Sequence, residues 1–278
     1  MSYFLYRWAK LSLQKCRGIF SCRYRADKSL ELKREKLKKN GIKCNLKRFK
    51  EGYLIDYEDM VFYLSSDEDF FVFNEIFIRN IYGVELNEKT IVIDIGSNIG
   101  LSTLFFARND QFLKVFSFEA VKETYEHSLV NFDLNPRLKN KIEVTNIGLS
   151  NKKYVETFLY HEKNKATAGI RGKKSPSYKY NSQAQTVEVH MNIASVLIEP
   201  IILKYSQYKK VLKIDCEGGE YQIIENLSKS GLLEKIDTLI LEWHDNGKEE
   251  ITYQLSRMNF SFFYQNEGQT GLIYAIRN

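Results

Sequence analysis

The chain has 278 residues, of which 44% are hydrophobic and 14% aromatic, so it carries enough apolar material for a packed core and is not disordered throughout. It has no stretch of about 18 uncharged apolar residues, so no transmembrane helix is expected. Charges interrupt the apolar N-terminal residues, which argues against a signal peptide. The four cysteines are scattered without a CxxC pair, which favours a reducing compartment over disulfides or a zinc site. We therefore expect a cytoplasmic protein.

Charge is distributed unevenly along the chain. Residues 1–50 carry 16 Lys and Arg against 3 Asp and Glu, a net charge of +13, whereas the remaining 228 residues carry 25 against 32, a net charge of −7. We interpret residues 1–50 as a basic helical N-terminal arm. Its expected partner is the rest of the domain, a second subunit in a homodimer, or the inner face of a membrane, contacted peripherally through residues 1–40.

Residues 51–87 are expected to form a hairpin and a helix that precede the catalytic domain. Alternating runs at 46–49 and 53–64 resemble the two strands of a hairpin. The sequence Ser65-Ser-Asp-Glu68 then resembles a capping box that opens an apolar helix.

From residue 90 onward, strand and helix patterns alternate, which is typical of a doubly wound parallel α/β sheet, and residues 88–278 are expected to form one domain. Two further strand-like runs, at 154–160 and 186–191, flank a polar loop whose cations are candidates for contacting an anionic substrate. The sheet strands are expected at 90–95, 113–119, 141–146, 210–215, 237–243, 259–264 and 271–277, and the helices at 99–109, 122–134, 219–229 and 247–258.

The stretch IVIDIGSNIGLST, residues 91–103, predicts a strand, a tight turn and a helix. Many α/β proteins hold a nucleotide in this way. Here Gly96 and Gly100 are four residues apart, with Ser97 and Asn98 between them. That spacing fits neither the Walker loop, which needs Gly-Lys-Ser/Thr, nor the GxGxxG loop of dinucleotide-binding folds.

Polar residues near this loop distinguish among cofactors. Asp94 would repel a pyrophosphate, but it suits a ligand with cationic groups, such as S-adenosylmethionine. Glu119 follows 25 residues later, at the end of the next strand, where a carboxylate accepts hydrogen bonds from ribose hydroxyls. Ala120 follows it, and Asn146 ends the third strand, where its amide is expected to contact the adenine edge. The cofactor site is therefore expected to contain Asp94, Gly96, Ser97, Asn98, Gly100, Glu119, Ala120 and Asn146.

A second group of charged residues lies in VLKIDCEGGE, residues 211–220. This stretch predicts a central strand, where charges are buried unless they are paired or used. Strand alternation places Lys213, Asp215 and Glu217 on one face, and open α/β sheets bind ligands at the carboxyl edge where the two acids lie. The following strand, DTLILEWHD, brings Glu242 and His244 to the same edge. These five side chains are the candidate catalytic residues.

The segments VIDIGSNIG, LKIDCEGGEYQIIE and LILEWH together resemble the FkbM-type family of class I S-adenosylmethionine-dependent methyltransferases. The resemblance covers residues 88–277. It implies a Rossmann-like seven-stranded sheet with an antiparallel last strand, and O-methylation, commonly of sugar or polyketide hydroxyls. It also assigns Glu220 to the second motif. Ser97 and Gly148 stand where alanine is expected.

Methyl transfer to an alcohol requires alignment and, near neutral pH, removal of the hydroxyl proton. The acids at the sheet edge and His244 are candidates for a general base. The same groups are also candidate ligands for a divalent metal, which would acidify the hydroxyl and make a protein base unnecessary. We favour the metal-free base, and we expect Lys213 to neutralise Asp215 or Glu217.

These patterns predict an S-adenosylmethionine-dependent O-methyltransferase that acts on a small molecule or glycan acceptor, with a sugar hydroxyl in a glycan or glycan precursor as the favoured target. One alternative is an RNA methyltransferase that uses the basic arm, although the arm contains no recognised nucleic-acid-binding module, and Asn135-Pro136 lies outside the position of an adenine-flipping loop. The other is a non-catalytic partner in a glycan-assembly complex, which would bind the cofactor without turnover.

Overall fold

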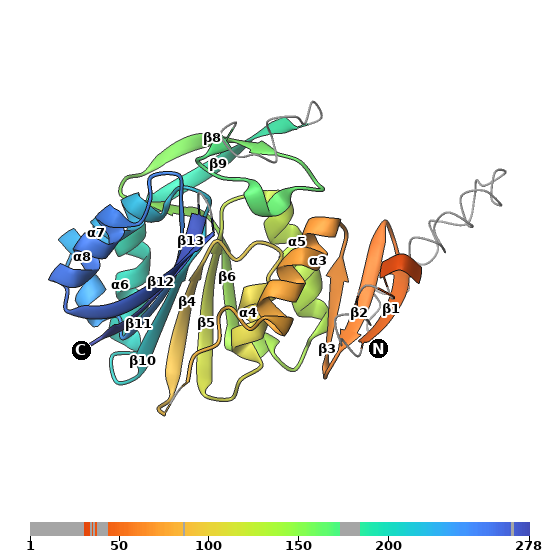
Figure 1. The fold of residues 1–278 in the computed structure, drawn as a ribbon, viewed down its shortest axis with the longest axis horizontal. Helices are drawn as coiled ribbons and strands as arrows, with labels where there is room; N and C mark the ends of the chain where they lie inside the picture. Colours follow the sequence, from red (N-terminus) through yellow and green to blue (C-terminus); the bar gives the residue numbers. More distant parts are fainter. Residues whose placement is uncertain are drawn as a thin grey trace.

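The computed structural model describes residues 31–33, 35, 37, 44–85, 87–172, 184–267 and 270–278. Its centre is a seven-stranded sheet in the order β12-β13-β11-β10-β4-β5-β6 (Figure 1). β13 is antiparallel to β11 and to β12, whereas the other neighbouring strands are parallel. The predicted Rossmann-like seven-stranded sheet with an antiparallel last strand is confirmed. The strands are β4 (Thr90–Ile95), β5 (Phe112–Glu119), β6 (Ile142–Asn146), β10 (Lys209–Ile214), β11 (Thr238–His244), β12 (Phe260–Glu267) and β13 (Thr270–Arg277).

Helices cover both faces of this sheet because its strands are apolar on both sides. In β4, Val92 packs on the side of α4, whereas Ile91 and Ile93 pack on the side of α6, α7 and α8. The four predicted helices and seven predicted sheet strands are all present, with ends shifted by at most three residues. The helices are α4 (Leu101–Ala107), α5 (Lys122–Leu134), α6 (Ala194–Lys204), α7 (Glu220–Lys229) and α8 (Glu249–Arg257).

Two elements were not anticipated from the sequence. The helix α6 contains Pro200, a residue that usually breaks a helix, but Ile198 and Ile202 bury its apolar face against the sheet. The three-residue strand β7 (Gly148–Ser150) pairs with β9 (Gln185–Ile193), which also pairs with the expected strand β8 (Tyr154–Tyr160). These three strands form a separate small sheet above the main one (Figure 1).

The segment before the main sheet forms three antiparallel strands, β1 (Cys44–Phe49), β2 (Gly52–Tyr57) and β3 (Met60–Leu64). The prediction of a single run over 53–64 is wrong, because the chain turns at Glu58, which has a φ of 52°. The capping box forms one residue later than predicted, between Ser66 and Asp69. It opens α3 (Asp67–Phe73), which continues into the π-helical turn η1 (Asn74–Ile78).

This N-terminal segment shares one hydrophobic core with the main sheet. Phe73 and Phe77 from α3 and η1 stack on each other, and Phe77 also contacts Phe105 of α4. Most of the predicted basic arm lies outside the described residues. Among the helices that the structure describes, none has both the length and the apolar character to span a bilayer.

Candidate active site

The loop after β4 has a backbone that only certain residues adopt readily. Gly96, Asn98 and Gly100 have φ values of 77°, 51° and 84°, in the left-handed region that favours glycine and asparagine. The N–H groups of Gly96 and Ser97 donate to the Phe118 carbonyl at 2.9 and 3.2 Å, which fixes the loop against β5. Gly100 then begins α4.

Glu119 lies where the sequence predicted it, at the end of β5 and beside this loop. Its Oε2 accepts the Asn98 N–H at 2.9 Å, and its Oε1 accepts the Val121 N–H at 2.9 Å. Burial raises the pKa of Glu119 to about 7, although the two backbone hydrogen bonds oppose the shift. Both oxygens retain lone pairs that can accept hydroxyl protons.

A cavity lies against the loop and the end of β5. Ser97 Oγ and Asn98 Oδ1 are buried and have no hydrogen-bond partner among the described residues. Unpaired buried polar atoms are costly, so their presence in a cavity wall fits a polar ligand. The residues of the predicted sites that line the cavity are Gly96, Ser97, Asn98, Glu119, Ala120, Lys213, Asp215 and Glu217.

Three predicted cofactor residues, Asp94, Gly100 and Asn146, are not in the cavity wall. Asp94 is fully buried under the loop, where Ser102 and Thr103 donate their hydroxyls to its Oδ2 at 2.7 and 2.8 Å. The side-chain amide of Asn146 donates to the backbone carbonyls of Glu119 and Ala120, at 2.9 and 3.1 Å. In this structure Asn146 thus holds backbone of the cavity wall, whereas Asp94 holds side chains beneath it.

Lys213 joins the two sequence motifs. Its Nζ lies 3.2 Å from Asp94 Oδ1 and 3.8 Å from Asp215 Oδ2, and it donates to the Gly96 carbonyl at 2.7 Å. Burial lowers the pKa of Lys213, but the adjacent carboxylates outweigh it and leave the pKa above its usual value. The expected neutralisation of Asp215 is present, but the shorter contact is to Asp94.

Asp215 and Glu217 both line the cavity, and each is oriented by a residue from elsewhere in the chain. The Tyr82 hydroxyl donates to Asp215 Oδ2 at 3.0 Å. Arg171 donates to Glu217 Oε2 at 3.1 Å and to both carboxylate oxygens of Asp245, at 2.9 and 3.0 Å. Burial raises the pKa of Glu217 to about 7.

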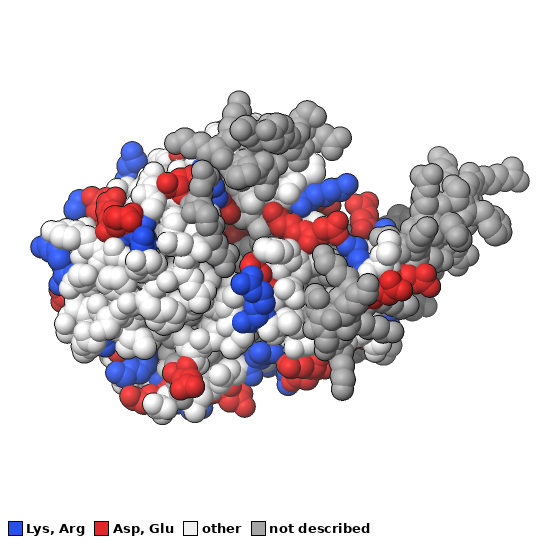
Figure 2. All heavy atoms as spheres, viewed as in Figure 1, with Lys and Arg blue, Asp and Glu red and all other residues white. Residues whose placement is uncertain are grey.

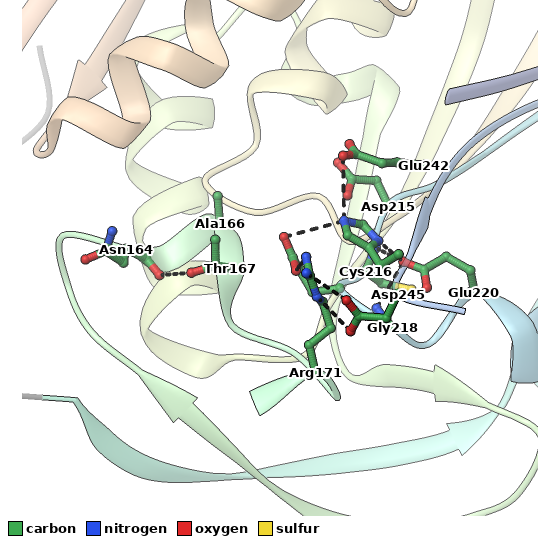
Figure 3. Close-up of polar contacts among 12 residues, drawn as sticks. Asn164, Ala166, Thr167, Arg171, Asp215, Cys216, Gly218, Glu220, Glu242 and Asp245 are labelled. Atoms are coloured by element: carbon green, nitrogen blue, oxygen red, sulfur yellow. Dashed lines mark hydrogen bonds and ion pairs between the residues drawn. The ribbon is translucent and has the colours of Figure 1, made fainter. Parts of the chain in front are cut away.

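His244 lies at the end of β11, within ion-pair distance of Glu220 and Glu242, two of the acids that Figure 3 labels, and its side chain is 2% exposed. Its Nδ1 lies 2.8 Å from Oε1 of the buried Glu220, and its Nε2 lies 3.6 Å from both Glu217 Oε1 and Glu242 Oε1. Burial lowers the pKa of His244, but the surrounding carboxylates outweigh it and raise the pKa to about 10.

The structure thus brings together all five predicted catalytic residues and adds two that the sequence did not single out for the site, Tyr82 and Arg171. Tyr82 follows η1 in the N-terminal segment and carries no motif. Arg171 was expected among the loop cations that contact an anionic substrate, but its guanidinium is instead occupied by Glu217 and Asp245. Lys165, another of those cations, is buried against Asp69.

A family model described as the methyltransferase FkbM domain matches residues 94–267, which is more than half of the chain. The chain belongs to the FkbM methyltransferase family. This methyltransferase uses S-adenosylmethionine as its cofactor, and the described fold is the one expected for such an enzyme.

Two curated proteins resemble this FkbM-family chain. Methyltransferase sdnD of Sordaria araneosa is 24% identical over 220 residues, which cover 70% of this chain and 83% of that protein. The AMB antimetabolite synthetase AmbE of Pseudomonas aeruginosa is 26% identical over 212 residues, which cover 66% of this chain. That match spans only 10% of the length of the synthetase.

Solved structures also resemble this chain. The crystal structure of methyltransferase FkbM from Methylobacillus flagellatus has a TM-score of 0.45 and 15% identity, over 73% of this chain and 47% of that chain. TrmK of M. capricolum, in complex with S-adenosylhomocysteine, has a TM-score of 0.40 and 14% identity, over 72% of this chain and 67% of that chain.

Proposed function

We propose that this methyltransferase transfers a methyl group to a hydroxyl oxygen, most directly that of a sugar in a glycan or glycan precursor. The observation that carries the proposal is the pair of carboxylates, Asp215 and Glu217, in the cavity wall next to the glycine loop. Near neutral pH a hydroxyl needs a general base to remove its proton during methyl transfer, whereas a neutral amine can attack through its lone pair without one. Sugar hydroxyls are also good donors to carboxylates.

S-adenosylmethionine supplies the methyl group for an in-line displacement, which makes alignment of the acceptor the main requirement. We assign its binding to Gly96, Ser97, Asn98, Glu119 and Ala120, because these residues line the cavity and include its unpaired polar atoms. Glu119 would accept the ribose hydroxyls. Asp94, Gly100 and Asn146 would hold the shape of this site from behind.

On the acceptor side, we assign proton removal to Glu217. Its carboxylate lines the cavity, and Arg171 fixes one oxygen, so the other is held in a defined direction. The product proton would remain on Glu217 until the acceptor leaves. Asp215, held by Tyr82, lies beside it and would orient the hydroxyl.

The test is turnover of methyl-labelled S-adenosylmethionine with a panel of nucleotide-sugars, lipid-linked glycans and RNA, followed by NMR to locate the new methyl group. We expect an O-methyl sugar. Glu119→Ala should abolish cofactor binding in calorimetry, whereas Asp215→Asn should keep binding and lose turnover. Transfer to RNA alone would contradict the proposal.

The charge distribution supports an uncharged or glycan acceptor over a nucleic acid. On the face shown in Figure 2, basic and acidic side chains of the described residues occur in small mixed groups. A nucleic-acid-binding face carries a continuous basic patch. Basic charge is concentrated instead in residues 1–50.

We further propose that residues 1–40 contact an anionic membrane surface peripherally, where a lipid-linked glycan would be found. Their excess of Lys and Arg, interspersed with aromatic residues, supports this. Cosedimentation with liposomes containing about 30% anionic lipid should be lost when residues 1–40 are deleted. Unchanged binding by the deletion variant would refute membrane contact through this segment.

A further inference from the structure

We propose that Asp215, Glu242 and His244 bind a divalent cation at the acceptor side of the cavity, with His244 Nε2 as the nitrogen ligand. One oxygen or nitrogen atom from each of the three residues lies within 4.8 Å of the others. The role that we give this cation rests on the proposed function, since the cation would orient and acidify the acceptor hydroxyl.

The spacing of the polar atoms suits a shared cation better than direct hydrogen bonds. His244 Nε2 is 3.6 Å from Glu242 Oε1, too far for a hydrogen bond. Two ligand atoms that each lie ~2.1–2.2 Å from one metal ion, at a tetrahedral angle, are ~3.4–3.6 Å apart. The observed separation therefore leaves room for an ion between the two side chains.

The orientation of His244 is an independent observation. Its side chain is 2% exposed, and its Nε2 lies 3.6 Å from a carboxylate oxygen of Glu217 and of Glu242, which is beyond hydrogen-bond distance. The other ring nitrogen, Nδ1, lies 2.8 Å from Glu220, which is itself completely buried. A metal-binding histidine commonly has its second nitrogen fixed by a carboxylate in this way. Glu220 thus presets the ring to offer Nε2 as a ligand.

The local charges also call for a cation. The two basic side chains nearby, Lys213 and Arg171, also pair with carboxylates outside the proposed cation site. Lys213 lies closer to Asp94 than to Asp215, and Arg171 makes two of its three hydrogen bonds to Asp245. Four carboxylates border His244 or its neighbours, namely Asp215, Glu217, Glu220 and Glu242, so a bound cation would lie among acidic groups.

The ligand set indicates which cation to expect. One imidazole nitrogen with carboxylate oxygens suits Mn²⁺ or Zn²⁺ better than Ca²⁺, which takes oxygen ligands almost exclusively. Asp215 lines the cavity and would present the ion to the acceptor. With the ion acidifying the hydroxyl, the proton would pass to the adjacent Glu217, so the two roles do not compete.

In the experiment, the full-length chain is treated with EDTA, dialysed and titrated with Mn²⁺. Binding is measured as the loss of the EPR signal of free Mn²⁺. We expect one Mn²⁺ per chain. Glu242→Gln should weaken binding at least tenfold. Glu220→Gln, which only orients His244, should weaken binding ~10- to 100-fold. Glu75→Gln is the matched control, because it removes a nearby negative charge without removing a ligand, and it should change the Kd less than about twofold.

Circular dichroism and S-adenosylmethionine binding establish that each variant is folded. If the folded wild-type chain binds Mn²⁺ no more tightly than Glu242→Gln, or if Glu75→Gln weakens binding as much as Glu242→Gln, there is no such site. The titration requires no acceptor, so it is independent of whether hydroxyls are methylated. Conversely, full O-methylation in EDTA would overturn the metal site while leaving the proposed function in place.

Discussion

A Cβ atom on Gly96 would lie 1.8 Å from the carbonyl oxygen of Asp215, so the ends of β4 and β10 are in direct backbone contact. The Asp215 N–H also donates to the Ile95 carbonyl at 3.1 Å. Glycine at position 96 is therefore needed as much for the approach of the neighbouring strand as for a cofactor. The two sequence motifs form one rigid unit between the cofactor loop and the acceptor-side acids.

We expect Gly96→Ala to lower the free energy of unfolding by more than about 2 kcal/mol, because a positive φ alone costs an alanine ~1–2 kcal/mol and the clash adds to that. Cofactor binding should also be lost. Urea denaturation and calorimetry measure the two effects. Gly231→Ala is the control, since Gly231 has a φ of 74° but nothing within 4 Å of the added Cβ. Equal destabilisation by both substitutions would show that the contact with Asp215 is unimportant.

The sequence predicted the sheet well because its information is local. Each strand is a short apolar run, and Glu119 ends one of them, so its place beside the glycine loop followed from the general geometry of parallel sheets. The same logic brought Asp215, Glu242 and His244 to one edge. Elements whose stability depends on tertiary packing, such as α6 with its internal Pro200, were not predictable in this way.

The contacts that orient the site could not be found by sequence periodicity. Tyr82 reaches Asp215 across 133 residues of chain, and Arg171 reaches Glu217 from a loop without regular structure. The sequence predicts that Asp94 faces a cationic ligand. In the structure the cation beside Asp94 is Lys213, and this pairing of two distant residues cannot be found from the sequence. Such pairings depend on how loops close over the sheet.

Tyr82→Phe tests the first of these contacts. The substitution removes the hydroxyl that donates to Asp215 but keeps the buried ring, which stacks on Phe106. A hydrogen bond to a charged group contributes ~1.5–3 kcal/mol, so we expect turnover to fall about tenfold or more while the Kd for S-adenosylmethionine is unchanged. Steady-state kinetics and calorimetry separate the two quantities.

Tyr274→Phe is the matched control for this substitution. The Tyr274 hydroxyl donates to the Ile81 carbonyl at 2.8 Å, so its loss disturbs the chain next to Tyr82 without touching Asp215. We expect near-normal turnover. A comparable loss in both variants would mean that the hydroxyl of Tyr82 acts only by holding its own segment in place.

Lys165→Met should be strongly destabilising. Lys165 Nζ lies 3.1 Å from Asp69 Oδ1, with side chains 2% and 1% exposed, and it fixes the turn η3 (Lys165–Thr167) to the start of α3. Removing one partner of a buried ion pair costs ~3–5 kcal/mol, because the other charge stays buried. Urea denaturation gives the difference in stability.

The exposed Lys163 provides the comparison for Lys165→Met, because Lys163→Met removes the same charge two residues away. We expect it to change the free energy of unfolding by less than about 0.5 kcal/mol. Adding Asp69→Asn to Lys165→Met should recover part of the lost stability, since it removes the carboxylate charge that Lys165→Met leaves buried without its ion-pair partner. If Asp69→Asn lowered the free energy of unfolding by the same amount in Lys165→Met as in the wild type, the two side chains would not interact.

Cofactor affinity should depend on pH through Glu119. Burial is the main cause that raises its pKa to about 7, with a smaller rise from Asp94, and the N–H groups of Val121 and Asn98 and the charge of Lys213 oppose it. The ionised carboxylate is the form that accepts ribose hydroxyls. As the pH falls through about 7 the carboxyl becomes protonated, so the Kd for S-adenosylmethionine should increase, approaching tenfold per pH unit well below the pKa.

Calorimetric titrations between about pH 6 and pH 8 measure this dependence. Glu119→Gln should bind S-adenosylmethionine more weakly at every pH. The glutamine N–H₂ group would face a backbone N–H that donates to a carboxylate oxygen in the wild type, and two donors cannot form a hydrogen bond. Its Kd should also be nearly constant over this range, since no group titrates at that position. If the variant kept the pH dependence of the wild type, another group would be responsible, and the assignment of Glu119 to the ribose would lose its main support.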